Sequence, residues 1–337
     1  MNELDLIRGF RDAVPEPGAD AVAQARARVL AGRPAPAGRP GHGRRRGRWL
    51  LATAVAAGTA VALVVAGGVA RGPKGDLAAA DVLRDAARVA ASRPDPGRLT
   101  PGRFWYARSV STAVATTGDQ PPWSVRQEFT REFWVGADGS GRIRERSGKA
   151  EFLTPQDRRN WEDSGRPDLG EGQSSDERFK AGELTAGSTV GTYDDLLALP
   201  TDPGRLYDYF HKQADGHSRG TEVEMFVLVS DVLRETPAPP ALQAALYEVA
   251  ARIPGVQLVG PTTDRTGRHG TGIAMVDGEG SRHELVFDPG TATPLGERET
   301  TIKPGQFAPG MTVPAGTVIS DSAELETGFV GSVTATP

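Results

Sequence analysis

The 337-residue sequence contains no cysteine. This absence excludes disulfides, thiolate zinc sites and cysteine nucleophiles together. It leaves the compartment open, because a core of sufficient size is stable without disulfides. The metalloprotease, nucleophile-elbow, phosphate-loop and dinucleotide-binding motifs are missing as well. We therefore expect a protein that is not an enzyme, with no catalytic residue, no metal site and no cofactor.

Side chains suited to chemistry are few and far apart in the sequence. The five histidines are His42, His211, His217, His269 and His283. His211 and His217 flank a turn, and we interpret them as a surface pair. Glu128 and Glu132 share one face of a predicted strand and lie about 13 Å apart by strand rise. That separation exceeds the one glycosidases use, so we interpret both as solvated.

Charge is divided unevenly along the chain. Residues 1–70 carry ten arginines and five acidic residues, a balance of +5, whereas residues 71–337 have a balance of -9. Neutralising phosphates requires a cationic face, which the acidic part does not offer. We therefore expect no nucleic-acid binding by the large C-terminal part.

An apolar run extends from Trp49 to Ala70 without a charge, an amide or a proline. As a helix its 22 residues span about 33 Å, which matches a hydrocarbon core of about 30 Å. Eight arginines lie between Arg26 and Arg48, and this excess indicates a cytoplasmic N-terminus. The sequence thus predicts a single transmembrane helix that contacts the lipid bilayer, with the large C-terminal part outside the cytoplasm.

A cleaved export signal competes with this interpretation, and so does a buried helix of a soluble protein. Gly68 and Ala70 supply the small residues of a cleavage site, and paired arginines before an apolar run are typical of twin-arginine signals. However, the apolar run is longer than the usual signal core of about 7–15 residues, and 48 residues precede it. We favour the permanent anchor.

The residues before the apolar run divide into two segments. Residues 1–31 are expected to form a cytoplasmic helical arm, because apolar side chains recur at helical spacing at Leu4, Ile7, Phe10 and Val14. Residues 32–48 are expected to form a basic linker rich in glycine and proline. The arm either lies on the anionic inner leaflet or docks to a cytoplasmic partner.

Residues 76–303 are expected to form one extracytoplasmic domain. A helix with Leu83, Ala87 and Ala90 on one face is followed by alternating strands near residues 104–114 and 125–135. Further helices follow between residues 192 and 254, and strands return up to residue 303. This order predicts an α+β fold in which helices cover a curved antiparallel sheet.

Two segments show neither a helical nor a strand pattern. The polar stretch from Arg158 to Ser188 is expected to be a loop, and residues 304–337 a C-terminal extension rich in glycine, proline and threonine. We interpret four aromatic residues as core, namely Phe104, Tyr106, Phe129 and Phe133. If the domain has a pocket, an apolar ligand is expected to enter where helices cover the curved sheet.

Five segments together resemble a known family. They are ELDLIRGFRDAVPEP, ADVLRDAA, FWYARS, VLRETPAPPALQAALYEVAARIPGV and ELVFDPGTATPLGER. Their order, with the arginine-flanked apolar run, resembles an uncharacterised family of actinobacterial single-pass membrane proteins over residues 2–301. Members are often encoded beside extracytoplasmic-function sigma factors. The strand–helix order is also similar to the half-barrel fold of lipoprotein carriers and of periplasmic sensors in sigma-factor pathways.

This resemblance implies a role in membrane signalling but supplies no catalytic residues. The zinc motif of one anti-sigma class, with one histidine and two cysteines, is absent because the chain has no cysteine. We expect a membrane-anchored binding or sensing protein whose arm regulates a cytoplasmic sigma factor. The alternative is a carrier-like module that binds lipid or lipoprotein in the cell envelope, and an enzyme with an unrecognised site is a third hypothesis.

Overall fold

The computed structural model describes residues 77–117, 121–181, 192–308 and 311–337. The expected helical arm (1–31), basic linker (32–48) and transmembrane helix (49–70) lie outside those ranges, so they stay predictions. Among the described residues, no helix combines the length and the apolar character needed to cross a bilayer.

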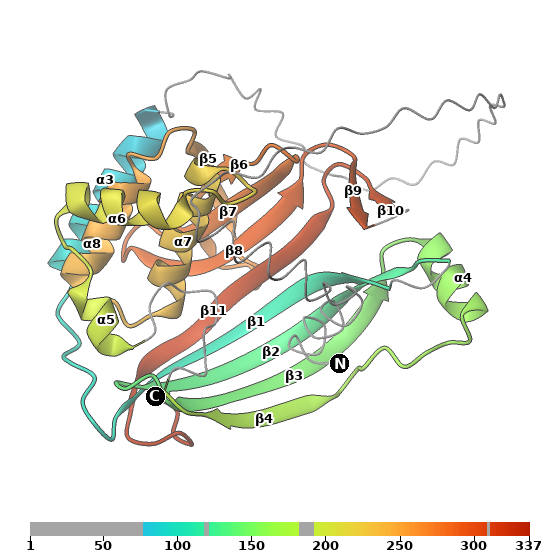
Figure 1. Ribbon diagram of the computed structural model, residues 1–337, viewed down its shortest axis with the longest axis horizontal. Coiled ribbons are helices and arrows are strands. Elements are labelled where there is room, and N and C mark those ends of the chain that lie inside the picture. The colour runs from blue at the N-terminus through green and yellow to red at the C-terminus, as the bar shows by residue number, and fades with distance from the viewer. Residues whose placement is uncertain (1–76, 118–120, 182–191, 309–310) are drawn as a thin grey trace, which may run out of the picture. The chain divides into compact units, whose positions relative to one another are not determined.

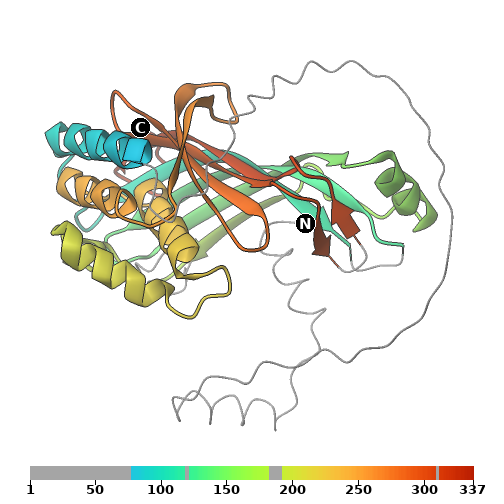
Figure 2. The same cartoon turned by 90° about the horizontal axis from the view of Figure 1, so that it is seen from above.

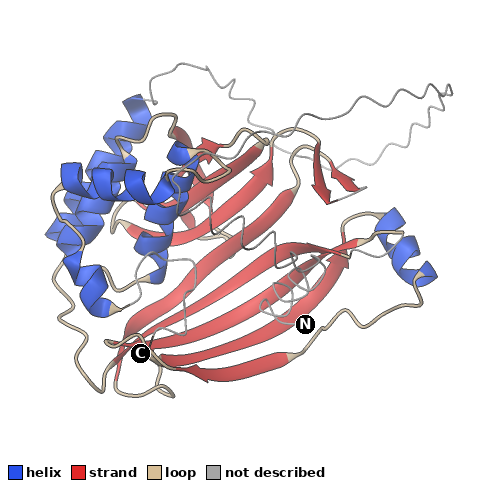
Figure 3. Cartoon of the chain, viewed as in Figure 1, coloured by secondary structure: helices blue, strands red, loops and turns tan. Residues whose placement is uncertain are grey.

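Nine antiparallel strands form one curved sheet within the described residues, in the order β4-β3-β2-β1-β11-β8-β7-β6-β5. Figure 3 shows these strands as a continuous red layer. The strands are β1 (Phe104–Thr116), β2 (Ser124–Gly136), β3 (Gly141–Phe152), β4 (Ser174–Phe179), β5 (Gln257–Thr263), β6 (His269–Val276), β7 (Ser281–Asp288), β8 (Thr293–Thr301) and β11 (Val318–Val330). A separate hairpin pairs β9 (Gly305–Ala308) with β10 (Met311–Val313).

The helices gather mainly at one end of the sheet. They are α3 (Leu77–Ser92), α4 (Pro155–Asp163), α5 (Tyr193–Ala198), α6 (Pro203–Ala214), α7 (Thr221–Glu235) and α8 (Pro240–Ala250). Helices α3, α5, α6, α7 and α8 lie together, whereas α4 lies at the other end (Figures 1 and 2). The expected α+β class, with helices on a curved antiparallel sheet, is confirmed for the described domain.

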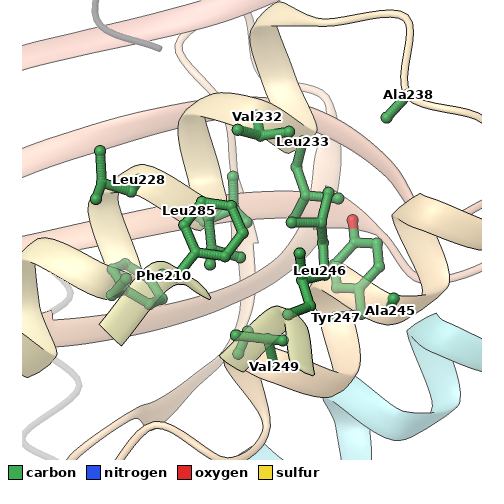
Figure 4. Packing of buried hydrophobic residues seen from close by; sticks show 14 of the residues in the cluster. Phe210, Leu228, Val232, Leu233, Ala238, Ala245, Leu246, Tyr247, Val249 and Leu285 are labelled. Atoms are coloured by element: carbon green, nitrogen blue, oxygen red, sulfur yellow. The ribbon is translucent and has the colours of Figure 1, made fainter. Parts of the chain in front are cut away.

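The main core lies between these helices and the sheet. The predicted apolar face of α8 is buried, and so is Ile253 just beyond the end of the helix: Leu242, Leu246, Val249 and Ile253 are at most 2% exposed. Figure 4 shows this face packed with side chains of α6 and α7 and with Leu285 of β7. Burying these apolar side chains is the main term that holds α8 on the sheet. Helix α6 begins as predicted, at Asp202, whose side chain accepts a hydrogen bond from the Arg205 amide.

The segment 304–337 is not an extension, because it supplies the strand at the centre of the sheet. Strand β11 pairs with β1 on one side and with β8 on the other. Its stretch SDSAELETG does not show the apolar alternation of a strand, because the buried positions include polar residues. Ser322 is 8% exposed, and the side chain of Glu324 is 10% exposed.

The expected loop from Arg158 to Ser188 is also wrong in part, because α4 and β4 lie within or across it. Helix α4 depends on its ends rather than on an apolar face: Thr154 caps it, and Pro155 occupies its first turn. Strand β4 is an edge strand with mostly exposed side chains, so it needs no alternation of apolar residues.

The four aromatic residues interpreted as core lie on two opposite faces of the sheet. Tyr106 pairs with Trp134, and Ala107 pairs with Phe133, so Phe104 and Tyr106 share a face that excludes Phe129 and Phe133. Both faces of β1 are covered at this end, since Trp105 and Tyr106 are each buried. The sequence alternation therefore does not tell which face is the core.

Candidate ligand cavity

A cavity of about 180 Å³ lies where α5 and α7 approach the face of the sheet formed by β1, β2, β3, β8 and β11. Helices cover the curved sheet here, which is where an apolar ligand is expected to enter if the domain has a pocket. The apolar part of its lining comprises Trp105, Ala107, Phe129, Phe133, Val135 and Leu196. The charged part comprises Arg131, Glu145, Arg234, Glu235, Glu297 and Glu324.

Aromatic rings form the apolar wall. Trp105 and Phe133 meet edge to face with ring centroids 6.4 Å apart, and Phe133 stacks on Phe179 of β4 at 5.8 Å. Edge-to-face and stacked aromatic pairs contribute about 0.5–1.5 kcal/mol beyond the burial of their area. The wall is therefore an apolar surface stabilised by ring contacts, and strands β1, β2 and β4 position it.

Arg234 of α7 is the centre of the charged end. Its side chain is 7% exposed, and its guanidinium lies 2.9 Å from Glu324, 3.1 Å from Glu297, 3.2 Å from Asp231 and 3.4 Å from Glu235. A buried guanidinium requires such acceptors, since removing water from a charge costs several kcal/mol, roughly. The network ties α7 to β8 and β11.

Burial changes the acidity of this network. It raises the pKa of Asp231 to about 7, while the nearby Arg234 opposes the rise. Burial also raises the pKa of Glu324, again against the effect of Arg234. Carboxylates buried away from water favour the neutral form. Both raised pKa values belong to the network around Arg234, in which Glu324 lines the cavity and Asp231 lies behind it.

Arg131 of β2 is the lining cation with the fewest acceptors. Among the described residues, its ion pair is with Glu235, at 3.8 Å, and its buried Nε has no hydrogen-bond partner. The guanidinium lies 5.1 Å from the centre of the Phe133 ring. The pairing of strands places it beside Ser109 of β1 and Glu145 of β3. Arg131 thus offers donors at the border between the apolar wall and the charged end.

The side chains considered for chemistry do not meet in this cavity. His211 stacks on Tyr207, and His217 lies 3.2 Å from Glu224. Glu128 pairs with Arg265 at 2.8 Å. Within the part of the chain that the structure describes, no group of three or more His, Asp or Glu side chains is placed to hold a metal ion.

Glu132, the other glutamate interpreted as solvated, is instead paired. It accepts a hydrogen bond from the Tyr106 hydroxyl at 3.1 Å and forms an ion pair with Arg144 at 3.2 Å. Burial and this hydrogen bond raise the pKa of Tyr106 to about 12. Glu132 thus supports the back of the sheet rather than the cavity.

The two arginines of the cavity were missed in the sequence, although each leaves a signal. Arg131 interrupts an alternation in which Val125, Phe129, Phe133 and Val135 face one side. A charge at such a position is costly unless the site gives it partners. Arg234 follows Leu233 in a helix whose neighbouring turns are buried. The sequence offers Asp231 and Glu235 of the same helix as partners, but it does not show Glu297 and Glu324, which come from distant strands.

Fold and site together define an α+β domain with a curved antiparallel sheet and an amphipathic cavity. No family model matches the chain, and no curated protein sequence matches it. The assignment of the chain to the α+β class therefore rests on the geometry of the described residues.

Solved structures that are similar to the chain include two MucB structures and a LolA superfamily protein. The Pseudomonas aeruginosa MucA/MucB complex is 13% identical over 77% of this chain and 58% of that chain, with a TM-score of 0.24. MucB is 14% identical over 78% and 61%, with a TM-score of 0.26. A LolA superfamily protein from Nitrosomonas europaea is 8% identical over 74% and 92%, with a TM-score of 0.17.

The chain thus spans about 60% of the length of the MucB chains it matches. At these TM-scores the similarities carry no argument about ligand or partner, so the function is argued from the cavity. Membership of an actinobacterial single-pass family stays a prediction.

Proposed function

We propose that the described domain binds the apolar part of an amphipathic ligand in its cavity, and that the chain is a membrane-anchored binding or sensing protein of the cell envelope. The observation that carries the proposal is the cavity of about 180 Å³, with an aromatic wall and a charged end. An apolar cavity of about 150 Å³ accepts benzene. The cavity therefore holds one ring or a short acyl segment, while the rest of a larger ligand stays outside.

The charges of the lining specify the polar group of this ligand. Four glutamates and two arginines line the cavity, so a free carboxylate or phosphate is repelled. One buried donor of Arg131, its Nε, nevertheless has no hydrogen-bond partner among the described residues. An uncharged acceptor, such as the carbonyl of an ester or an amide, meets both conditions. We infer an acyl ester or acyl amide as the ligand class.

Calorimetric titration of residues 71–337 with three eight-carbon probes tests this class. Methyl octanoate is expected to bind at least tenfold more tightly than octanoate or octylamine. The Arg131→Leu variant is expected to lose about tenfold in affinity, since a hydrogen bond from a charged donor contributes about 1.5–3 kcal/mol. Arg108→Leu, at an exposed position on the opposite face of the sheet, is the matched control. If no probe binds, the proposal is wrong.

The anchor and the arm complete the proposal. The run from Trp49 to Ala70 fixes the chain in the cell membrane, with residues 1–31 in the cytoplasm, where they engage a sigma factor. Protease added outside intact cells is expected to digest the domain but spare the arm. A pull-down of residues 1–48 with a purified extracytoplasmic-function sigma factor tests whether the arm binds this partner. An arm with Leu4, Ile7 and Phe10 changed to Asp serves as the control.

A carrier-like module that transfers lipid or lipoprotein within the envelope is the second candidate. The aromatic wall supports it, because binding an acyl segment requires no partner on the cytoplasmic side. The two candidates differ in what ligand binding does. A carrier accelerates transfer of a labelled acyl ligand between vesicles, whereas a sensor changes the affinity of the arm for its partner.

A further inference from the structure

The cavity floor contains a strip of paired residues on β1 and β2 that changes from polar to apolar along the strands. Six of the lining residues pair across these two strands in three consecutive rows. The rows are Ser109 with Arg131, Ala107 with Phe133, and Trp105 with Val135. Successive rows lie about 7 Å apart, because a strand rises about 3.4 Å per residue and alternate residues share a face. An acyl chain aligned with the strands therefore leaves the polar row and crosses two apolar rows.

Ala107 has the smallest side chain in these rows. Its methyl group lies next to Trp105 along β1 and across from Phe133 of β2. Ala107 lines the cavity and is partly exposed, whereas Trp105 is 5% exposed, so the methyl group borders open space. Among the described lining residues it is the only alanine, and the two glycines, Gly136 and Gly139, lie at the β2–β3 hairpin instead. The open part of the apolar floor is therefore above Ala107.

The side chains around Ala107 are held by contacts of their own. The rings of Trp105 and Phe133 meet at an interplanar angle of 82°, and Phe133 stacks on Phe179. Leu196 of α5 lines the cavity from the helix side and is 1% exposed. A close-packed interior yields little to an added group, so these neighbours do not make room for a larger side chain at position 107. The residue at this position therefore controls the free volume of the floor.

The size of the cavity determines the length of chain that it holds. An apolar cavity of about 150 Å³ accepts benzene, which has six carbons. The cavity of this protein has about 180 Å³, so it holds an acyl segment of about six carbons. With the carbonyl at the Arg131 donor in the polar row, the alkyl carbons of this segment pass over Ala107.

We propose that Ala107 is the specificity-determining residue for acyl length, because its small side chain leaves room for about six acyl carbons. The inference rests on the proposed function, since it takes an acyl ester or acyl amide as the ligand. It adds a length limit to that function, because carbons beyond the limit stay outside the cavity and contribute little to binding. A larger side chain at position 107 fills the same space and lowers the limit by about as many carbons as it adds.

The length limit predicts how affinity changes along a series of esters. Each carbon that enters the cavity should raise the affinity about fourfold, whereas a carbon that stays in water should add little. Methyl hexanoate has two more acyl carbons than methyl butanoate and should bind to the wild type about 15-fold more tightly. Methyl octanoate should bind within about threefold of methyl hexanoate, since its last two carbons stay outside.

The experiment titrates these three esters by calorimetry against the full chain and against full-chain variants at position 107. Ala107→Val lowers the limit to about four carbons, so methyl hexanoate should bind within about threefold of methyl butanoate. Ala107→Leu lowers the limit to about three carbons and should in addition weaken the binding of methyl butanoate about fourfold. Valine suits a strand, so the first variant keeps the test available if the second does not fold.

Ala115→Leu is the matched control, because Ala115 lies on the same face of β1 but does not line the cavity. It should keep the wild-type preference for methyl hexanoate, and circular dichroism checks that each variant is folded. A wild-type affinity that rises as steeply from hexanoate to octanoate as from butanoate to hexanoate overturns the length limit. Folded variants that keep the wild-type preference overturn the role of Ala107 but leave the proposed function standing. If no ester binds to the wild type, the proposed function itself is wrong and the length limit falls with it.

Discussion

Asp231 lies on α7 with its carboxylate largely removed from water and 3.2 Å from the Arg234 guanidinium. Burial raises its pKa from 3.8 to about 7, so the folded protein holds this proton more tightly than the unfolded chain does. The resulting stabilisation is complete below about pH 4 and is lost as the pH rises through 7. Across that window the free energy of unfolding falls by on the order of 4 kcal/mol from this group.

Asp231→Asn removes the titrating group but keeps an acceptor for Arg234. The variant should therefore unfold at a higher temperature than the wild type at pH 8.5 and show little difference at pH 4.5. Thermal unfolding followed by circular dichroism at both pH values measures this. Asp208→Asn on α6, at an exposed position, is the control and should not change the pH profile. An unaltered profile for Asp231→Asn would contradict the assignment.

Tyr247 of α8 is fully buried, and its hydroxyl donates to the Ala292 carbonyl at 3.0 Å. Tyr247→Phe leaves that carbonyl without its donor, and a buried unsatisfied group costs about 1–3 kcal/mol. We expect the urea midpoint to fall accordingly, with the slope unchanged. Tyr209→Phe is the control, because the Tyr209 hydroxyl has no hydrogen-bond partner within the described residues. An equally large fall of the urea midpoint in this control would show that the Tyr247 hydrogen bond is not the cause.

Single residues also show which features could be predicted from the sequence and which could not. The buried face of α8 could be predicted because four apolar residues at helical spacing are sufficient evidence for it. Arg131 and Arg234 could not be assigned, because their role depends on acids and aromatics brought from other strands and helices. A charge inside an apolar pattern signals that a partner exists, but the fold decides which one it is.

At the scale of elements, the contact between β8 and β11 depends on a glycine. A Cβ built on Gly296 would overlap the Ser322 carbonyl of the neighbouring strand. Because the obstacle is main chain, it cannot rotate away, and Gly296→Ala should lower the free energy of unfolding by at least about 2 kcal/mol. Gly278→Ala is the matched control, since a Cβ there meets nothing within 4 Å. Denaturant unfolding of both variants measures the difference, and equal stability would refute the close approach.

Elements with their own pattern could be predicted, and elements that rely on neighbours could not. Helices α6, α7 and α8 have apolar faces, and α6 has a recognisable cap. Edge strand β4 buries neither face, so its polar sequence was indistinguishable from a loop. Strand β11 carries polar residues inside the sheet because Arg234 and the flanking strands satisfy them.

For the whole molecule, the boundary expected at residue 303 gives a direct test. A chain that ends there lacks β11 and leaves β1 and β8 with unpaired edges at the centre of the sheet. Such edges pair with other chains and lead to aggregation. We expect this chain to be insoluble or to lose cooperative unfolding, measured by sedimentation and circular dichroism. A chain of residues 71–337 should unfold cooperatively, and a soluble, folded chain ending at 303 would contradict the sheet order.

The position of β11 in the sequence also determines when the sheet can be completed during synthesis. The ribosome completes β1 at Thr116 but reaches the end of β11 only at Val330, about 200 residues later. At about 5–20 residues per second, the half of the sheet that contains β1 waits roughly 10–40 s for the strand that joins it to β8. The half that contains β8 is complete only at Thr301, so it waits a few seconds. Until β11 is made, β1 remains an open edge. A chaperone that captures the nascent chain in this interval therefore meets an incomplete sheet with an open edge.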